Sequence, residues 1–173
     1  MEPKLSLSGD VAQVFEAHHA LVFRTAYRIT GNAADAEDVL QTIFLRLLRR
    51  QNADSVDSQE SYLRRAAVNA SLDLIRSRRE DHPSEWEDIP SGGRDFDTGE
   101  LRSALRRALR RLNPKSAEIF TLRFLEGFSN QEIARMLGIS RVLVAVIVHR
   151  ARGQLQHELR DYRQGGRDEK SGI

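Results

Sequence analysis

Apolar side chains return every three or four positions along most of the chain, which is the spacing of one face of an α-helix. In the first part of the chain this pattern predicts three helices, over 11–29, 33–50 and 57–79. Gly31 separates the first two, and Asn32 is a candidate N-cap because it stands three residues before Asp35. Asp57 and Glu60 have the spacing of a capping box at the start of the third helix. The sequence therefore predicts a three-helix or four-helix N-terminal bundle.

The same periodicity returns after residue 100. Leucine and alanine mark a helix over 101–112, and Asn113-Pro114 supplies an N-cap followed by proline at the first position of a helix that ends near Leu125. No segment alternates apolar and polar residues as a half-buried strand would. The pattern thus favours an all-α fold in both halves of the chain.

The most specific local pattern lies between residues 128 and 160. Ser129 and Glu132 have capping-box spacing, Gly138 stands where the helix that follows them should end, and Ser140 is placed to cap another, longer helix. A short helix, a tight turn containing glycine and a longer helix form a helix-turn-helix. We therefore expect a C-terminal helix-turn-helix domain.

Between the two helical parts lies a segment without an apolar period. Residues 80–100 contain Pro83, Pro90 and three glycines, and they carry eight acidic side chains against one arginine. Such a composition cannot bury enough surface to fold alone. We expect two small helical domains joined by a flexible acidic linker. The expected divisions are 1–79 for the first domain, 80–100 for the linker, 101–160 for the second domain and 161–173 for a polar tail.

The formal net charge of +2 hides a polarised chain. Residues 1–79 carry a net charge of +1, residues 80–100 carry −7 and residues 101–173 carry +8. Of the 27 basic residues 24 are arginine, whose guanidinium group makes forked contacts with phosphate or carboxylate, although GC-rich coding gives the same bias. The basic second half is compatible with a polyanionic partner.

Several classes of function are disfavoured. The chain has no cysteine, which excludes disulfides, thiolate metal sites and cysteine catalysis. The first ten residues lack the pattern of a signal peptide, and no run approaches the ~18 apolar residues of a membrane span, so we expect a cytoplasmic protein without membrane insertion. No motif of a metal site, nucleophile elbow or phosphate loop is present. We therefore expect no metal, no cofactor and no enzyme activity.

The third predicted helix has a second, polar face. At 100° per residue, Arg65, Asn69 and Arg76 fall within about 40° of one another and opposite the apolar stripe, and Arg78 and Arg79 extend the basic end. One interpretation is an arginine face that only meets solvent. The other is a nucleic-acid face, because arginine holds phosphate and asparagine can bind a base edge. The neighbouring helix-turn-helix favours the second.

Two sets of residues match the conserved regions of one known family. The first set is Phe23-Arg24, Ala34 to Gln41, Phe44, Tyr62-Leu63, Asn69, Asp73 and Arg76. The second set is Leu109, Leu112, Pro114, Leu122-Arg123, Glu126-Gly127, Glu132 to Ala134, Leu137 to Ser140 and His149 to Arg152. These sets resemble the second and the fourth conserved region of the extracytoplasmic-function (ECF) sigma factors. They stand in that family's order, with the linker between them.

The resemblance implies a dissociable initiation subunit of bacterial RNA polymerase. Its partners would be the polymerase core, promoter DNA and an anti-sigma factor. The implied polymerase-binding residues are Asp35, Glu37, Asp38, Leu40, Gln41 and Phe44, although the acidic ones could instead only support a helix start. The implied DNA-binding residues are Arg65, Asn69, Asp73, Arg76, Arg78 and Arg79 for the minus-ten element, and Arg141, Val142, Leu143, Ala145, Val146, His149 and Arg150 for the minus-thirty-five element.

Two connecting segments also acquire implied roles. Gln51 to Ser58 would match the loop that captures a flipped base, and base capture is one way to melt DNA without ATP. The acidic linker would thread toward the polymerase's active cleft and imitate nucleic acid, or it would serve only as a solubilising tether.

The recognition helix departs from the family pattern. The family commonly has small and polar residues where this chain reads Val142 to Ile147. Val142, Val146 and His149 are expected on the side facing DNA, yet valine offers a base only methyl contact. Arg141 and Arg150 can still hold phosphates. This leaves two rivals to a promoter-reading factor: an interaction module with weakened promoter readout, and a nucleic-acid enzyme, which the lack of a carboxylate cluster disfavours.

Overall fold

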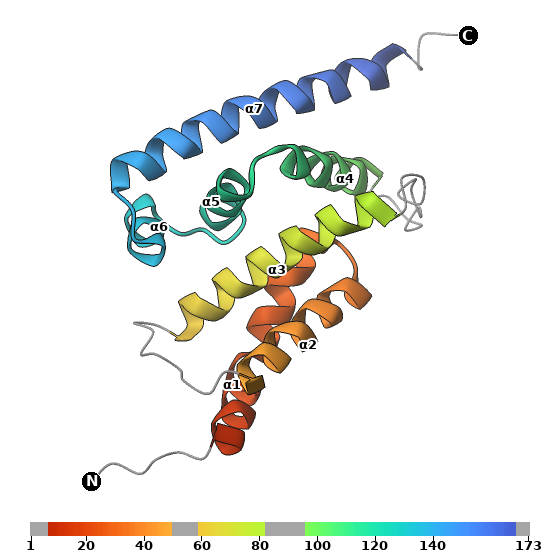
Figure 1. Ribbon diagram of the computed structural model, residues 1–173. Helices are drawn as coiled ribbons and strands as arrows, with labels where there is room; N and C mark the ends of the chain where they lie inside the picture. Colours follow the sequence, from red (N-terminus) through yellow and green to blue (C-terminus); the bar gives the residue numbers. More distant parts are fainter. Residues whose placement is uncertain (1–6, 50–58, 82–95, 169–173) are drawn as a thin grey trace. The chain divides into compact units, whose positions relative to one another are not determined.

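The computed structural model describes residues 7–49, 59–81 and 96–168, and in these ranges the chain is helical without any strand (Figure 1). The seven helices of this part are α1 (Leu7–Thr30), α2 (Ala33–Arg49), α3 (Gln59–Asp81), α4 (Phe96–Arg111), α5 (Pro114–Phe124), α6 (Asn130–Leu137) and α7 (Arg141–Asp168). The predicted all-α fold is confirmed. The expected base-capturing loop, Gln51 to Ser58, lies outside the described residues, as does the Asp57 of the predicted capping box.

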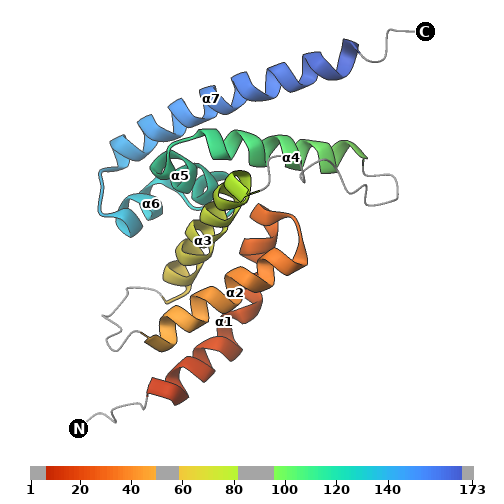
Figure 2. The same cartoon turned by 45° about the vertical axis from the view of Figure 1, so that its right-hand side comes forward.

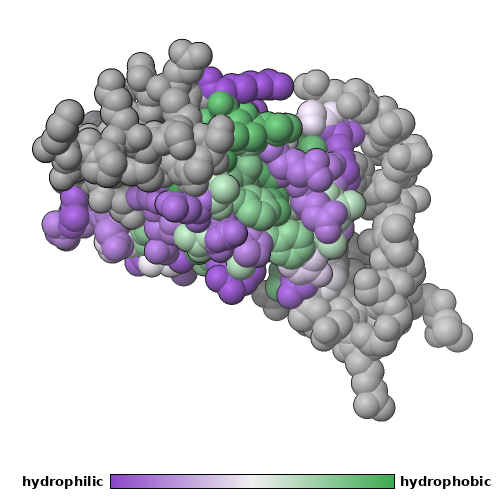
Figure 3. All heavy atoms as spheres, turned by 90° about the horizontal axis from the view of Figure 1, so that it is seen from below, coloured by the Kyte–Doolittle hydropathy of each residue, from purple (hydrophilic) through white to green (hydrophobic). Residues whose placement is uncertain are grey.

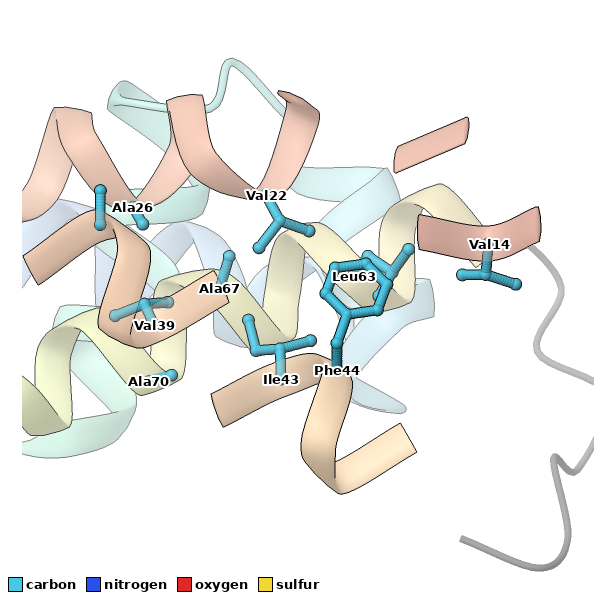
Figure 4. Close-up of a cluster of buried hydrophobic side chains, with 10 residues drawn as sticks. Val14, Val22, Ala26, Val39, Ile43, Phe44, Leu63, Ala67 and Ala70 are labelled. Carbon is cyan, nitrogen blue, oxygen red and sulfur yellow. The ribbon is translucent and has the colours of Figure 1, made fainter. Parts of the chain in front are cut away.

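The chain divides into two compact units within α3, after Leu74. In the first unit α1 and α2 pack against each other, as Figures 1 and 2 both show. Side chains from all three helices fill one apolar cluster (Figure 4). Its buried members are Val14, Val22, Ala26, Ala36, Val39, Ile43, Phe44, Leu63, Ala67 and Ala70. The close packing of this cluster fixes which face of α2 turns outward.

A tight bend connects α1 to α2. Gly31 has a φ of 80°, a left-handed conformation that glycine adopts without a Cβ clash, and its N–H donates to the carbonyl of Tyr27 at 2.9 Å. The Thr30 hydroxyl donates to the carbonyl of Ala26 at 2.9 Å. The predicted break at Gly31 is confirmed, and it brings α2 back along α1.

In the second unit α7 contacts α4, α5 and α6 (Figure 2). The core residues that α7 contributes are Val144, Ala151 and Leu155, which are all buried. An ion pair joins Arg111, at the end of α4, to Glu158 of α7. Both side chains are partly exposed, so this ion pair adds at most about 1 kcal/mol to the stability of the unit. Apolar packing therefore supplies most of that stability.

The helices on either side extend into the expected linker. α3 continues to Asp81, and α4 begins at Phe96 rather than at Leu101. The backbone is helical from Phe96 to Glu100 although the sequence there lacks an apolar period. Of the expected linker 80–100, residues 82–95 lie outside the described part.

Candidate nucleic-acid interface

Hydrogen bonds at both ends define the short helix α6. Ser129 is the N-cap: its Oγ accepts from the Glu132 N–H at 3.2 Å, and the Glu132 carboxylate accepts from the Ser129 N–H at 2.7 Å. These bonds, the backbone one first, hold the pKa of Glu132 below its usual value. The predicted capping box is therefore present, and it sets where α6 begins.

The turn from α6 into α7 is equally well determined. Gly138 has a φ of 63°, and the Ile139 N–H donates to the Ala134 carbonyl at 3.1 Å. Ser140 then caps α7, because its Oγ accepts from the Leu143 N–H at 3.1 Å. α6 and α7 also contact each other (Figure 1). This is the predicted helix-turn-helix, and it makes α7 the helix that would enter a DNA groove.

The first turns of α7 expose apolar side chains. Val142 is 73% exposed, Leu143 45% and Val146 39%, whereas Val144 is fully buried. The polar or small residues beside them are also exposed, and they are Arg141, Ala145, His149 and Arg150. Val142, Val146 and His149, which the helical period places away from the core, are thus exposed. Val142 and Val146 are not core residues.

The acidic start of α2 is only partly on the surface. Asp35 is 1% exposed, its N–H donates to Asn32 Oδ1 at 2.8 Å, and Asn32 Nδ2 donates to its carboxylate at 2.6 Å. In this chain Asp35, expected as a polymerase contact, is therefore buried at the start of α2 and hydrogen-bonded to Asn32. Glu37, Asp38 and Gln41 are exposed.

The two apolar residues expected to bind polymerase together with the acidic ones are also not fully on the surface. Phe44 is buried in the core, where its ring meets Phe15 edge-on at 4.9 Å between centroids, and Leu40 is half-buried. Phe44, expected among the polymerase-binding residues, therefore packs inside the first unit. Leu45 and Leu48, which were not expected to be functional, are 50% and 54% exposed.

These two leucines share a face with the acidic residues. At 100° per residue, Glu37, Gln41, Leu45 and Leu48 lie within about 80° of one another. Figure 3 shows an apolar area open to solvent on one face of the molecule, between hydrophilic side chains. The spacing 37, 41, 45, 48 was present in the sequence, but the leucines could equally have belonged to the core stripe. We call Glu37, Asp38, Gln41, Leu45 and Leu48 the α2 face.

α3 carries the predicted basic face. Arg65, Asn69, Arg76 and Arg78 are half-buried and Asp73 is exposed, while the side chain of Arg79 lies outside the described set. All of the described five already have an interaction within the chain. Helical spacing keeps Arg65, Asn69 and Arg76 on one side of α3, but a ligand there would have to exchange these intramolecular contacts.

The described residues offer neither a metal site nor a membrane-spanning helix. No cluster of three or more histidine, aspartate or glutamate side chains there could hold a metal ion. None of the helices in the described ranges is both long and apolar enough to cross a membrane. The chemistry that the described residues offer is that of binding surfaces: carboxylates and leucines on α2, guanidinium groups and an amide on α3, and valines between arginines on α7.

Two family models match the chain. Sigma-70 region 2 matches residues 14–80, and Sigma-70 region 4 matches residues 102–155. The first match covers α2, nearly all of α3 and most of α1, and the second covers α5, α6, most of α4 and the first half of α7. The two matched segments therefore contain the α2 face, the basic face of α3 and the helix-turn-helix.

Curated relatives give the same result. The RNA polymerase sigma-E factor of Streptomyces coelicolor is 32% identical over 142 residues, which is 80% of this chain and 79% of the relative. The ECF RNA polymerase sigma factor SigM of Mycobacterium tuberculosis is 32% identical over 145 residues, covering 83% and 74%. SigE of Mycolicibacterium smegmatis is 32% identical over 158 residues, but the match spans only 60% of that longer protein.

A solved structure supports the fold. The chain is similar to the sigma factor RpoE of Bartonella quintana in its co-crystal structure with the anti-sigma factor NepR, with a TM-score of 0.53 and 22% identity. The match covers 87% of this chain and 97% of that one.

Proposed function

The chain belongs to the ECF RNA polymerase sigma factors, and from that premise we propose that it directs bacterial RNA polymerase core to specific promoters and opens their minus-ten region. The observation that carries this proposal is the pair of matched regions in sequence order, region 2 over residues 14–80 and region 4 over residues 102–155. The role requires binding surfaces rather than a catalytic centre. It would be carried out in the cytoplasm, where polymerase and promoter DNA meet.

Polymerase docking is assigned to the α2 face. Glu37 and Asp38 supply negative charge, and Leu45 and Leu48 supply an apolar end about two to three turns further along the same helix. A surface with a charged part and an apolar part gains specificity from the first and affinity from the second. Asp35, in this proposal, sets the position of the helix end and makes no contact with the polymerase.

Opening of the minus-ten element is assigned to α3. Arg65, Arg76 and Arg78, with Arg79, would hold phosphates, and Asn69 with Asp73 would meet a base. Extruding a base costs a few kcal/mol, and a protein site that receives it supplies that energy from binding. The half-buried state of Asn69 and Arg76 supports a role that begins only when DNA replaces their present contacts.

The upstream element is assigned to α7, with the residues Arg141, Val142, Leu143, Ala145, Val146, His149 and Arg150. Direct support is the helix-turn-helix geometry and the exposure of all seven residues. An anti-sigma factor is a proposed regulatory partner, because the similar protein RpoE was crystallised with one.

One alternative function rests on a specific observation. The exposed Val142, Leu143 and Val146 would suit a protein partner, so the chain could be an interaction module that binds polymerase or an anti-sigma factor with weakened promoter readout. Two measurements separate it from the proposal: binding to purified core, and selection of promoters from a random DNA library by the assembled complex. A sigma factor enriches a common minus-ten sequence, whereas an interaction module binds core and enriches none.

A further inference from the structure

The outward face of α7 is apolar in its first turns and has basic residues on both sides. Taking Val142 as the reference at 100° per residue, Val146 lies about 40° away and Leu143 about 100° away, and His149 follows about 20° from Val142. Arg150 falls at about 80°, between Val146 and Leu143, while Arg152 falls about 80° to the opposite side. All six side chains are exposed. The first turns of the helix therefore present methyl groups, and a guanidinium group lies on either side of Val142 further along.

Charge along this part of the chain has one sign. From Ile133 through His157 the sequence contains no aspartate or glutamate and four arginines, Arg135, Arg141, Arg150 and Arg152, all of which are exposed. On α7, Arg150 on one side and Arg141 with Arg152 on the other lie about a helix diameter apart, which matches the separation of the two phosphate backbones that border a DNA major groove. An apolar protein surface would not need arginines on both edges, so charge complementarity favours DNA as the occupant.

The floor of a major groove offers one apolar group to such a helix. Thymine carries a C5-methyl group there, while the other base edges present donors and acceptors that valine and leucine cannot pair with. A valine placed over a donor or acceptor would remove it from water without replacing the hydrogen bond, which is unfavourable.

We infer that α7 recognises its upstream DNA element through thymine methyl groups packed against Val142, Val146 and Leu143, with Arg141, Arg150 and Arg152 holding the phosphates on both sides. This inference rests on the proposed function and specifies how that one surface discriminates. Burying a single methyl group against the valines changes affinity by roughly three- to fourfold. The upstream element is then read by several small contributions, and bidentate hydrogen bonds contribute none of its discrimination.

The test removes the methyl groups from the DNA and leaves the protein unchanged. Promoters are first selected from a random duplex library by the full chain assembled with bacterial RNA polymerase core. Each upstream thymine of a selected promoter is then replaced in turn by deoxyuridine, which lacks the C5-methyl group and keeps every hydrogen-bonding group. At one or more upstream positions the replacement should weaken promoter binding by roughly three- to fourfold.

A variant of the protein links that effect to the valines. In Val142→Ser/Val146→Ser the deoxyuridine replacements at the positions that these two residues contact should lose most of their effect, since serine has no methyl group to pack against thymine. Gln154→Ala changes an exposed residue of the same helix outside the named set, and it should keep the wild-type response to deoxyuridine. Because Val142 and Val146 are exposed, the double variant should fold normally.

Three results would overturn the inference. Equal binding of thymine and deoxyuridine promoters that are still opened would reject methyl recognition and leave the proposed function standing. An unchanged deoxyuridine effect in Val142→Ser/Val146→Ser would show that these valines do not contact the methyl groups, and lost self-association or lost protein binding in the same variant would make them a protein surface. Failure to enrich any promoter would contradict the proposed function and this inference with it.

Discussion

Asn32 and Asp35 are joined by two hydrogen bonds, one in which the Asp35 N–H donates to Asn32 Oδ1 and one in which Asn32 Nδ2 donates to the Asp35 carboxylate. The pair closes the start of α2 and takes the Asp35 carboxylate out of solvent. Negative charge remains on the surface at Glu37 and Asp38. Neighbouring acidic residues of one motif thus have different physical roles, and separate substitutions should separate them.

Removing the cap should lower stability without removing surface charge. Asn32→Ala should destabilise the first unit by about 1 kcal/mol, because Asn32 Oδ1 satisfies an N–H in the first turn of α2. The change would be measured as a fall in Tm and as faster hydrogen exchange in α2. Asn32→Ser, which can also cap a helix, should keep most of the wild-type stability. A Tm of Asn32→Ala equal to that of wild type would mean that the cap contributes nothing to stability.

Charge reversal on the α2 face should change binding and leave stability unchanged. Glu37→Lys/Asp38→Lys should weaken binding to the polymerase core and leave Tm nearly unchanged, since both side chains are exposed and reverse sign at the proposed contact. Binding is measured by competition with wild type for core at physiological salt. Glu16→Lys, a charge reversal at an exposed position of α1, is the matched control. If Glu37→Lys/Asp38→Lys competes as well as wild type, docking is not on this face.

The apolar end of the same face can be tested separately. Leu48→Asp should weaken binding to the polymerase core about tenfold or more while the first unit stays folded. The reason is that Leu48 is half-exposed and contributes little to the hydrophobic core of that unit. Phe44→Ala should instead unfold or strongly destabilise the first unit, at a cost of about 3–5 kcal/mol, because its ring is buried in the cluster. Equal effects of the two substitutions on Tm would contradict the division between surface and core.

On α3 the two kinds of side chain predict two kinds of defect. Asn69→Ala should lose discrimination at one base of the minus-ten element, whereas Arg76→Ala should weaken all promoters alike and reduce the dependence of log affinity on log salt by about one unit. Promoter variants with single changes, titrated at several salt concentrations, measure both. A uniform loss from Asn69→Ala across these variants would make Asn69 a structural residue.

Much of this architecture was visible in the sequence because the signals are local. Asn113, Ser129, Gly138 and Ser140 have the expected capping roles, and Val142 faces outward as the helical period predicts. Each of these depends on residues within four positions of one another.

What the sequence left undetermined depends on packing. Asp35 and Glu37 are both acidic residues near the start of α2, yet in the folded chain the first is buried and the second is exposed. Phe44 and Leu45 are likewise adjacent and apolar, yet Phe44 is buried in the hydrophobic core and Leu45 is half-exposed. The start of α4 at Phe96 was missed because acidic residues at a helix N-terminus leave no apolar period to detect.

Run-off transcription with purified bacterial RNA polymerase core tests the proposed function most directly. On a promoter selected by the assembled complex, adding the full chain should produce transcripts of a single length that core alone does not make. Heparin-resistant complexes should form on the same template without ATP, since opening draws on binding energy. Stable binding of the chain to core with no promoter-dependent transcript on any selected template would contradict the assignment and leave an interaction module.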